Sequence, residues 1–248
     1  MRDEWTAFEV IRPDGAGPVV LVCEHASARI PSELRDLGLS EASRHSHAAW
    51  DIGARDVALA MSAALDAPLV AGSISRLVYD CNRPETAPDA IPALSERHAV
   101  PGNEGLDAGA RRDRCVRVHD PFHAALDALL DGRTDRPALV TVHSFTPVFH
   151  GRRREVQLGF LSHSDDRFAR AALAEAGTRH RASLNAPYGP GDGVTYTLAR
   201  HGEARGLPTL MIEIRNDLID RPETAAQMGS HLATVLCRAL AALDEAAA

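Results

Sequence analysis

Residues 137–144, PALVTVHS, contain the stretch that decides the fold. The part ALVTV is apolar on both faces of an extended chain, which is typical of a strand covered on both sides. The runs PVVLVCE (18–24) and LPTLMIEIR (207–215) have the same character. Strands of this kind need helices above and below them, so the three runs predict the central strands of an α/β sheet.

Further short apolar runs predict additional strands at 67–72 (APLVAG), 76–80 (RLVYD) and 155–162 (EVQLGFLS). Alanine-rich stretches with helical spacing separate most of these runs. They lie at 51–66, 107–132, 165–177 and 221–248. We expect Pro121 to kink the second helix or to start a new segment, and Gly177 to cap the third. The alternation predicts a three-layer α/β/α fold.

The composition restricts the partners of the chain. Its 248 residues favour one domain spanning 1–248, and its net charge of −7 argues against nucleic acid and anionic membranes as partners. All 27 basic residues are arginines, which excludes a lysine base, a Schiff base and a P-loop lysine. We therefore expect a small-molecule partner and a monomer or small homo-oligomer.

Cysteine usage and the first residues indicate a compartment. The four cysteines are scattered without a C-x-x-C pair, so a structural zinc knuckle is not expected. The opening MRDEWTAFEV is acidic where a signal peptide would be basic, and no apolar run is long enough to span a bilayer. These features predict a soluble cytoplasmic protein with free thiols.

Polar side chains follow the three predicted central strands. Glu24 and His25 follow the first, His143 ends the second, and Glu213 and Arg215 end the third. Sites in α/β proteins form at the carboxyl ends of parallel strands, so we expect these residues to converge on one rim. Two histidines with two carboxylates suit a divalent metal with an open coordination position. The alternative is that each histidine only satisfies local hydrogen bonds.

Other candidates carry a weaker signal. Cys23 lies inside an apolar run and is expected to be a structural thiol, and Ser144 lacks a G-x-S-x-G elbow. His45 and His47 lie two residues apart, on different faces of a helix, and are expected to be solvated. Asp51, at an expected helix start, is either a metal ligand or an N-cap.

The stretch SRLVYDCNRPET (75–86) combines Arg76, Asn82 and Arg83 near a strand end. It is either a solvated loop or a carboxylate-binding group. Guanidinium groups bind carboxylates bidentately, and an asparagine adds a hydrogen bond. We expect these three residues, with Arg215, to bind substrate carboxylates, and Asp80 to orient one of the arginines.

Several motifs resemble one family. VCEHASARIP, AWDIGA, SRLVYDCNRP, TVHSFTP and MIEIRND, in this order, resemble the motifs of the N-formylglutamate amidohydrolase family, over nearly the whole chain. That family is similar in turn to zinc carboxypeptidases and aspartoacylases. The resemblance implies a zinc-peptidase-like fold with a mixed, mostly parallel sheet between helices.

The resemblance also implies roles for individual residues. His25 and His143 match the metal histidines, Asn82 and Arg83 match the carboxylate-binding pair, and Glu213 matches the general base. The chain departs from the carboxypeptidase pattern at Ala28, where those enzymes have a glutamate ligand. The missing carboxylate would then come from Glu24 or Asp51.

The expected activity is metal-dependent hydrolysis of the acyl amide of an N-acyl amino acid such as N-formyl-L-glutamate, a step of histidine catabolism. The metal, Zn²⁺ by preference, would polarise the acyl carbonyl and acidify a water. Glu213 would move the proton and His143 would belong to both the catalytic and the metal group. Alternatives are a related deacylase or peptidase-like hydrolase and a metal-free carboxylate-binding protein. The long segments 83–107 and 185–197 are expected to be lids or disordered.

Overall fold

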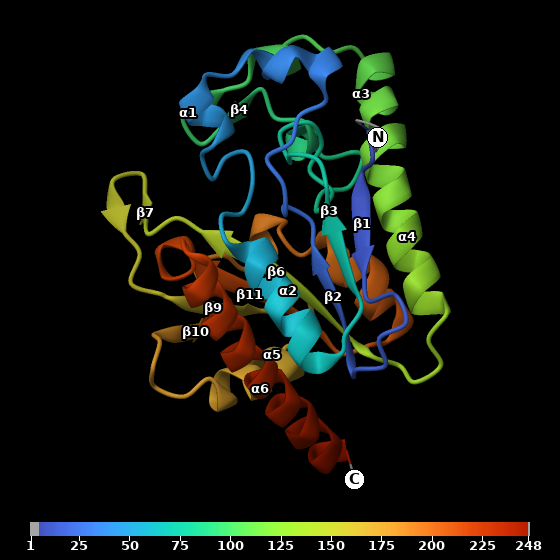
Figure 1. Ribbon diagram of the computed structural model, residues 1–248, viewed down its shortest axis with the longest axis vertical. Coiled ribbons are helices and arrows are strands. Elements are labelled where there is room, and N and C mark those ends of the chain that lie inside the picture. Colours follow the sequence, from blue (N-terminus) through green and yellow to red (C-terminus); the bar gives the residue numbers. More distant parts are fainter. Residues whose placement is uncertain (1–4, 248) are drawn as a thin grey trace.

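A seven-stranded mixed sheet forms the centre of the molecule in a computed structural model, which describes residues 5–247 (Figure 1). The strand order is β1-β3-β2-β6-β11-β9-β10. The strands are β1 (Phe8–Ile11), β2 (Val19–Cys23), β3 (Leu69–Gly72), β6 (Ala138–Phe145), β9 (Leu158–Leu161), β10 (Ala182–Leu184) and β11 (Thr209–Arg215).

The strands predicted to be central are neighbours. β3, β2, β6 and β11 are parallel to one another in that order, and β9 and β10 form another parallel pair. β1 is antiparallel to β3, and β9 is antiparallel to β11. Every residue of β2, β6 and β11 is buried, which confirms that these strands are covered on both faces.

Helices cover both faces of the sheet, which confirms the three-layer architecture. The helices α2 (Ala54–Leu65), α5 (Arg167–Glu175) and α6 (Pro222–Ala247) cover one face and enclose a core that includes Val19 and Leu21 (Figure 1). On the other face, Val20 and Val22 pack in a core with α4 (Asp120–Asp131). Alternate residues of one strand therefore enter two separate cores.

The remaining elements are short and lie in the connections. They are η1 (Ser32–Gly38), α1 (Glu41–Arg44), η2 (Pro88–Ala90), β4 (Leu94–Ser95), β5 (His98–Ala99), η3 (Pro101–Asn103), α3 (Ala108–Arg114), η4 (Cys115–His119), β7 (Val148–Phe149), β8 (Arg152–Arg153), η5 (Pro190–Asp192), η6 (Leu198–Gly202), η7 (Glu203–Arg205) and η8 (Asn216–Leu218).

The strand predicted at 76–80 is wrong. The segment forms a turn in which the Val78 amide donates to the Ser75 carbonyl at 2.9 Å, and the Leu77 amide donates to the Ser75 hydroxyl. The segment does not pair with a strand, but its apolar residues are buried in the core on the face of the sheet that carries Val20 and Val22. The edge strands β1 and β10, which carry partly polar sequences, were not predicted.

The helix predicted at 107–132 continues through Pro121. α3 passes through the π-helical turn η4 directly into α4, whose first turn holds the proline. Proline lacks the amide hydrogen that an α-helix uses in its regular hydrogen bonds. The π-helical turn before Pro121 already departs from that regular pattern, so the proline is tolerated at this position. Gly177 lies just beyond α5 at a φ of 68°, as expected of a glycine that ends a helix.

Segment 83–107 is folded and contains the β4–β5 hairpin between η2 and η3. Residues of this hairpin and of segment 185–197 line the same cavity as the strand-end histidines. Both segments therefore border the candidate site. Within residues 5–247, no helix combines the length and the apolar character that crossing a membrane needs.

Candidate active site

Three elements bring the candidate residues to one edge of the sheet. His25 follows β2, His143 lies near the end of β6, and Glu213 lies opposite His143 in the register of β11. Asp51 precedes α2, and the N-cap of that helix is Gly53, with no side-chain capping bond. Asp51 is therefore not the cap of α2, and its carboxylate faces the strand-end histidines.

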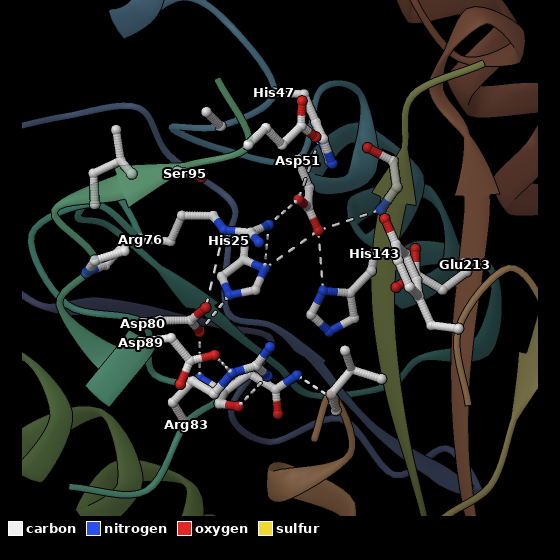
Figure 2. A pocket seen from close by; sticks show the side chains of 18 of the residues that line it. His25, His47, Asp51, Arg76, Asp80, Arg83, Asp89, Ser95, His143 and Glu213 are labelled. Atoms are coloured by element: carbon white, nitrogen blue, oxygen red, sulfur yellow. Dashed lines mark hydrogen bonds and ion pairs between the residues drawn. The ribbon is translucent and has the colours of Figure 1, made fainter. Parts of the chain in front are cut away.

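The Asp51 carboxylate is the centre of this group (Figure 2). Its Oδ2 atom lies 3.0 Å from His143 Nδ1, 3.4 Å from His25 Nδ1 and 3.3 Å from the amide nitrogen of Ser144. The two imidazole rings meet edge to face, with centroids 5.0 Å apart. Two Nδ1 atoms and one carboxylate thus form a compact, buried donor set.

A second carboxylate lies next to the far nitrogen of each histidine. His25 Nε2 lies 2.7 Å from Asp80 Oδ1, and His143 Nε2 lies 3.1 Å from Glu24 Oε2. Carboxylates in this position fix the orientation of a histidine and increase the basicity of its other nitrogen. Glu24 therefore lies behind His143, whereas Asp51 lies between the two histidines.

Arg76 brings a positive charge to the same group. Its Nη1 lies 2.9 Å from Asp51 Oδ1 and 3.3 Å from His25 Nδ1, and its Nε lies 3.9 Å from Asp80. Asp80 thus contacts Arg76 as expected, but its shorter contact is with His25. The guanidinium compensates part of the negative charge of the buried carboxylates.

The carboxylates of this group ionise readily despite their burial. Burial alone raises the pKa values of Glu24, Asp51 and Asp80, but the histidine contacts lower them by more, and all three pKa values lie below their ordinary range. Burial likewise lowers the pKa values of His25 and His143, yet the adjacent carboxylates raise both above the ordinary histidine value. Negative charge is therefore concentrated around the two histidines.

Glu213 behaves differently from these carboxylates. Burial raises its pKa to about 7, and its Oε2 has no hydrogen-bond partner among the described residues. Arg215, two residues further along the same strand, does not pair with Glu213, because Arg215 donates to Asp217 at 2.8 Å and to the Arg154 carbonyl at 3.0 Å. Glu213 instead faces the cavity that also contains His25 and His143.

The cavity has a volume of about 270 Å³. Its floor includes His25, Asp51, Arg76, His143 and Glu213, and its walls include Asn82, Arg83, Tyr188 and the segment 92–96. Arg215 is outside this lining, so the prediction that Arg215 binds substrate has no support from the geometry. Arg76 brings a guanidinium group to the floor of the cavity, and Arg83 brings another to its wall.

Asn82 and Arg83 are held by different partners. Asn82 Oδ1 accepts from the Thr197 amide at 3.1 Å, and its Nδ2 donates to the Val194 carbonyl, so this side chain connects two loops around the cavity. Arg83 donates through Nε to Asp89 at 2.8 Å and through Nη1 to the Gly193 carbonyl at 2.8 Å. These contacts use Nε and Nη1 and orient the guanidinium at the cavity wall.

Two residues of the site have roles that the sequence did not indicate. His47, expected to be solvated, is largely buried in the cavity wall, with Nδ1 3.6 Å from Asp51 Oδ1. The spacing of four residues between His47 and Asp51 could have indicated this contact, because the turns between them bring both side chains into the cavity lining. Asp80, expected to orient an arginine, has its shortest contact with His25.

The other candidates have structural partners. The Ser144 hydroxyl donates to the Ile52 carbonyl at 2.9 Å, which fixes the segment next to Asp51. Cys23 is a buried free thiol in the core beneath α2, as predicted for a structural cysteine. Neither arrangement is that of an activated nucleophile.

Comparisons with known proteins identify the family. The model of the N-formylglutamate amidohydrolase family matches residues 17–220. The gene product Atu2144 of Agrobacterium tumefaciens is 45% identical, with a TM-score of 0.95, over 97% of each chain. N-formylglutamate amidohydrolase from Ralstonia eutropha JMP134 shares the fold at 19% identity, with a TM-score of 0.71, over 96% of this chain and 99% of the other.

No curated protein matches the chain. The family model nevertheless covers most of the sequence and includes every candidate residue from Glu24 to Arg215, which confirms the resemblance noted from the motifs. The chain belongs to the N-formylglutamate amidohydrolase family and is a hydrolase that acts on an amide.

Proposed function

We propose that this protein is a metal-dependent amidohydrolase that removes the acyl group of an N-acyl amino acid such as N-formyl-L-glutamate. One observation carries the proposal: His25 and His143 both direct Nδ1 at Asp51, in a cavity that also contains Glu213. Membership of the family supports amide hydrolysis. The metal and the substrate are the parts that need testing.

The residues fit a divalent cation. Two imidazole nitrogens and one carboxylate oxygen are a donor set typical of catalytic Zn²⁺. Asp80 and Glu24 lie next to the opposite nitrogens of the two histidines, and carboxylates commonly stand in this position behind metal-binding imidazoles. We therefore assign His25, Asp51 and His143 as the ligands, with Glu24 as the partner of His143.

The charge of the group supports the same assignment. Glu24, Asp51 and Asp80 are three buried carboxylates with lowered pKa values, and Arg76 supplies one compensating positive charge. Two further positive charges are needed for neutrality. Without a cation, both histidines must be protonated to supply them. One divalent ion supplies both charges and leaves the imidazoles neutral, as metal binding requires.

The protein's own residues complete the chemistry. A divalent metal supplies Lewis acidity, which polarises an amide carbonyl and makes water a stronger acid. Glu213 would accept a proton from the attacking water and deliver it to the leaving amine. Arg83, with Arg76, would bind substrate carboxylates, and Asn82 would hold the loops that enclose the cavity.

The cavity supports a small anionic substrate. Its volume of about 270 Å³ suits an amino acid with a small acyl group, and two arginines line it. The net charge of −7 does not oppose this, because nearby arginines determine the potential inside a pocket. A second carboxylate on the substrate, as in glutamate, would use the second guanidinium.

The test combines metal content with turnover. Purified protein should contain a divalent ion, lose hydrolysis of N-formyl-L-glutamate after chelation, and recover it when Zn²⁺ is restored. The variant His143→Ala should lose the ion and the activity together. Full activity in protein free of metal would overturn the assignment. Tight binding of N-formyl-L-glutamate without turnover, in metal-loaded protein, would instead indicate a carboxylate-binding protein.

A further inference from the structure

A second cluster of metal-binding side chains lies on the π-helical turn η4. Cys115 Sγ is 3.8 Å from His119 Nδ1 and 3.5 Å from Asp120 Oδ1, and these last two atoms are 3.0 Å apart. A sulfur, a nitrogen and an oxygen atom that can each bind a metal therefore lie close together. Cys115 and His119 are buried, and the Asp120 side chain is 41% exposed, which leaves one side open to solvent.

The wide turn explains why these three side chains meet. In a π-helix each turn contains more residues than in an α-helix, so the residues four and five positions ahead both lie above a given side chain. His119 and Asp120 stand in these positions relative to Cys115. In a regular α-helix Asp120 would point away from the sulfur. π-helical turns are frequent at functional sites, which makes this one notable.

The spacing of the donors matches a tetrahedral ion. Zinc bonds of about 2.3 Å to sulfur and about 2.0 Å to nitrogen or oxygen, at tetrahedral angles, place the donors roughly 3.3–3.6 Å apart. The three measured separations of 3.8, 3.5 and 3.0 Å lie within a few tenths of an ångström of that range. Small rotations of side chains would be sufficient to bind the ion.

We propose that Cys115, His119 and Asp120 form a second site for a borderline transition-metal ion, with Zn²⁺ as the natural occupant. One thiolate, one imidazole and one carboxylate suit such an ion better than Mg²⁺ or Ca²⁺, which prefer oxygen ligands. The open side next to Asp120 would admit water as the fourth ligand.

The outer atoms of the ligands have partners in the same region. His119 Nε2 lies 3.4 Å from the Tyr196 hydroxyl, and Arg112 donates to Asp120 Oδ2 at 3.1 Å, which turns Oδ1 toward the cluster. Such outer contacts hold ligands in place in known metal sites. The imidazole and the carboxylate are therefore oriented before any ion binds.

Tyr79 gives independent support. Its hydroxyl lies close to Cys115 and is buried, yet it has no hydrogen-bond partner of good geometry among residues 5–247. A buried hydroxyl without a partner is costly, and such exceptions need an explanation. A metal-bound thiolate at Cys115, or a water on the ion, would provide the missing acceptor.

The second site lies behind the candidate active site. Tyr79 and Cys81 face η4, and Cys81 Sγ lies 4.0 Å from the Val118 carbonyl, whereas Asp80 and Asn82 face the active-site cavity. An ion on η4 would therefore stabilise the turn that supports residues 79–83. Its role would be structural, and the proposal stands independently of the activity proposed above.

Cobalt provides a direct test on the full-length protein. Metal-free protein is titrated with Co²⁺, and the near-ultraviolet absorption is followed for a sulfur-to-cobalt charge-transfer band. The site of His25, Asp51 and His143 has no sulfur ligand, so the band reports only a cysteine site. We expect two bound equivalents and a strong band in the unmodified protein.

The variants separate the two sites. Cys115→Ser should lose the charge-transfer band and one equivalent of bound Co²⁺. His143→Ala should lose the other equivalent of Co²⁺ and keep the band. Asp120→Asn should weaken binding of Co²⁺ at the cysteine site by tenfold or more. Cys237→Ser, which changes the exposed thiol, is the matched control and should keep both. Circular dichroism checks folding, and if Cys115→Ser does not fold, Asp120→Asn decides.

Two outcomes would overturn the proposal. The first is a folded protein that binds Co²⁺ without any charge-transfer band, which would mean that the cluster is a set of hydrogen bonds only. The second is a charge-transfer band that disappears in Cys237→Ser but survives in Cys115→Ser, or survives in Asp120→Asn with the affinity for Co²⁺ unchanged. That pattern would assign the metal to the exposed thiol.

Discussion

Individual side chains in the cavity differ in ionisation because their partners differ. Asp51 receives contacts from two histidines and an arginine, and its pKa is far below the ordinary range despite complete burial. Glu213, on the neighbouring strand, is equally buried, and its pKa is raised to about 7. Carboxylates in unlike environments can take unlike roles, and the roles proposed here are a cation ligand for Asp51 and a base for Glu213.

The first prediction concerns Glu213. The variant Glu213→Gln keeps the shape of the side chain but cannot accept a proton, so kcat should fall by roughly 10²–10⁴. Metal content and thermal stability should change little. Glu155→Gln, at an exposed position, is the matched control and should retain full activity. A loss of stability with unchanged kcat per folded molecule would remove Glu213 from the mechanism.

The second prediction concerns Arg83. Removal of its guanidinium in Arg83→Ala should raise KM for N-formyl-L-glutamate by a factor that corresponds to about 2–5 kcal/mol, because a desolvated charge pair is lost. The effect should disappear for a substrate whose carboxylate is replaced by an amide. Arg97→Ala, an exposed arginine of the same loop, serves as control. Equal losses on both substrates would show that Arg83 is structural.

At the level of elements, the start of α2 positions Asp51. Gly53 caps this helix at a φ of 79°, and a Cβ atom there would lie 2.2 Å from the Ile219 carbonyl oxygen. The Asp51 amide donates to the His25 carbonyl at 2.9 Å, so the same turn connects two of the proposed metal ligands. Close packing of backbone on backbone thus determines where the carboxylate lies.

The third prediction follows from this contact. Gly53→Ala should destabilise the protein by roughly 2–4 kcal/mol, since it combines left-handed strain with overpacking. Gly105→Ala is the matched control: its φ is 64°, but nothing lies within 4 Å of the added Cβ. It should cost only about 1 kcal/mol. Urea denaturation of both variants measures the difference, and equal losses would contradict the role of the Ile219 contact.

At the scale of the whole molecule, buried histidines with lowered pKa values should make the folded state less stable in acid. His123 Nδ1 lies 2.7 Å from His201 Nε2, and His201 Nδ1 lies 2.9 Å from Asp127. Burial, with the neighbouring His119, His201 and Arg200, lowers the pKa of His123 far below its ordinary value. Burial also lowers the pKa of His201 to about 4, although Asp127 acts in the opposite direction and Arg205 assists the lowering.

The fourth prediction is the dependence of stability on pH. Below the ordinary histidine pKa of about 6.5, the unfolded chain binds protons that the folded chain excludes, so stability should fall as pH decreases from about 6.5 to about 4. His123→Gln should reduce this slope by about one proton, or about 1.4 kcal/mol per pH unit. The exposed His45→Gln should leave it unchanged. Denaturation midpoints across this range provide the measurement, and an unchanged slope in His123→Gln would contradict a neutral His123.

Much of the fold follows from local patterns. The runs at 18–24, 137–144 and 207–215 are apolar on both faces, and they became β2, β6 and β11 because only a covered central sheet removes both faces from water. The edge strands and the turn at 76–80 did not follow, because long-range pairing and burial decide short segments. Local patterns were thus sufficient for the centre of the sheet and insufficient for its edges.

For the candidate site, the sequence by itself determined which residue types end the central strands: His25, His143 and Glu213. Parallel strands end on the same side, so their convergence could be predicted. Only the tertiary structure decided that Asp51 lies between the histidines while Glu24 lies behind one of them, and that Arg215 turns to Asp217. Strand periodicity specifies the face of a residue, but contacts between distant segments determine which atoms meet.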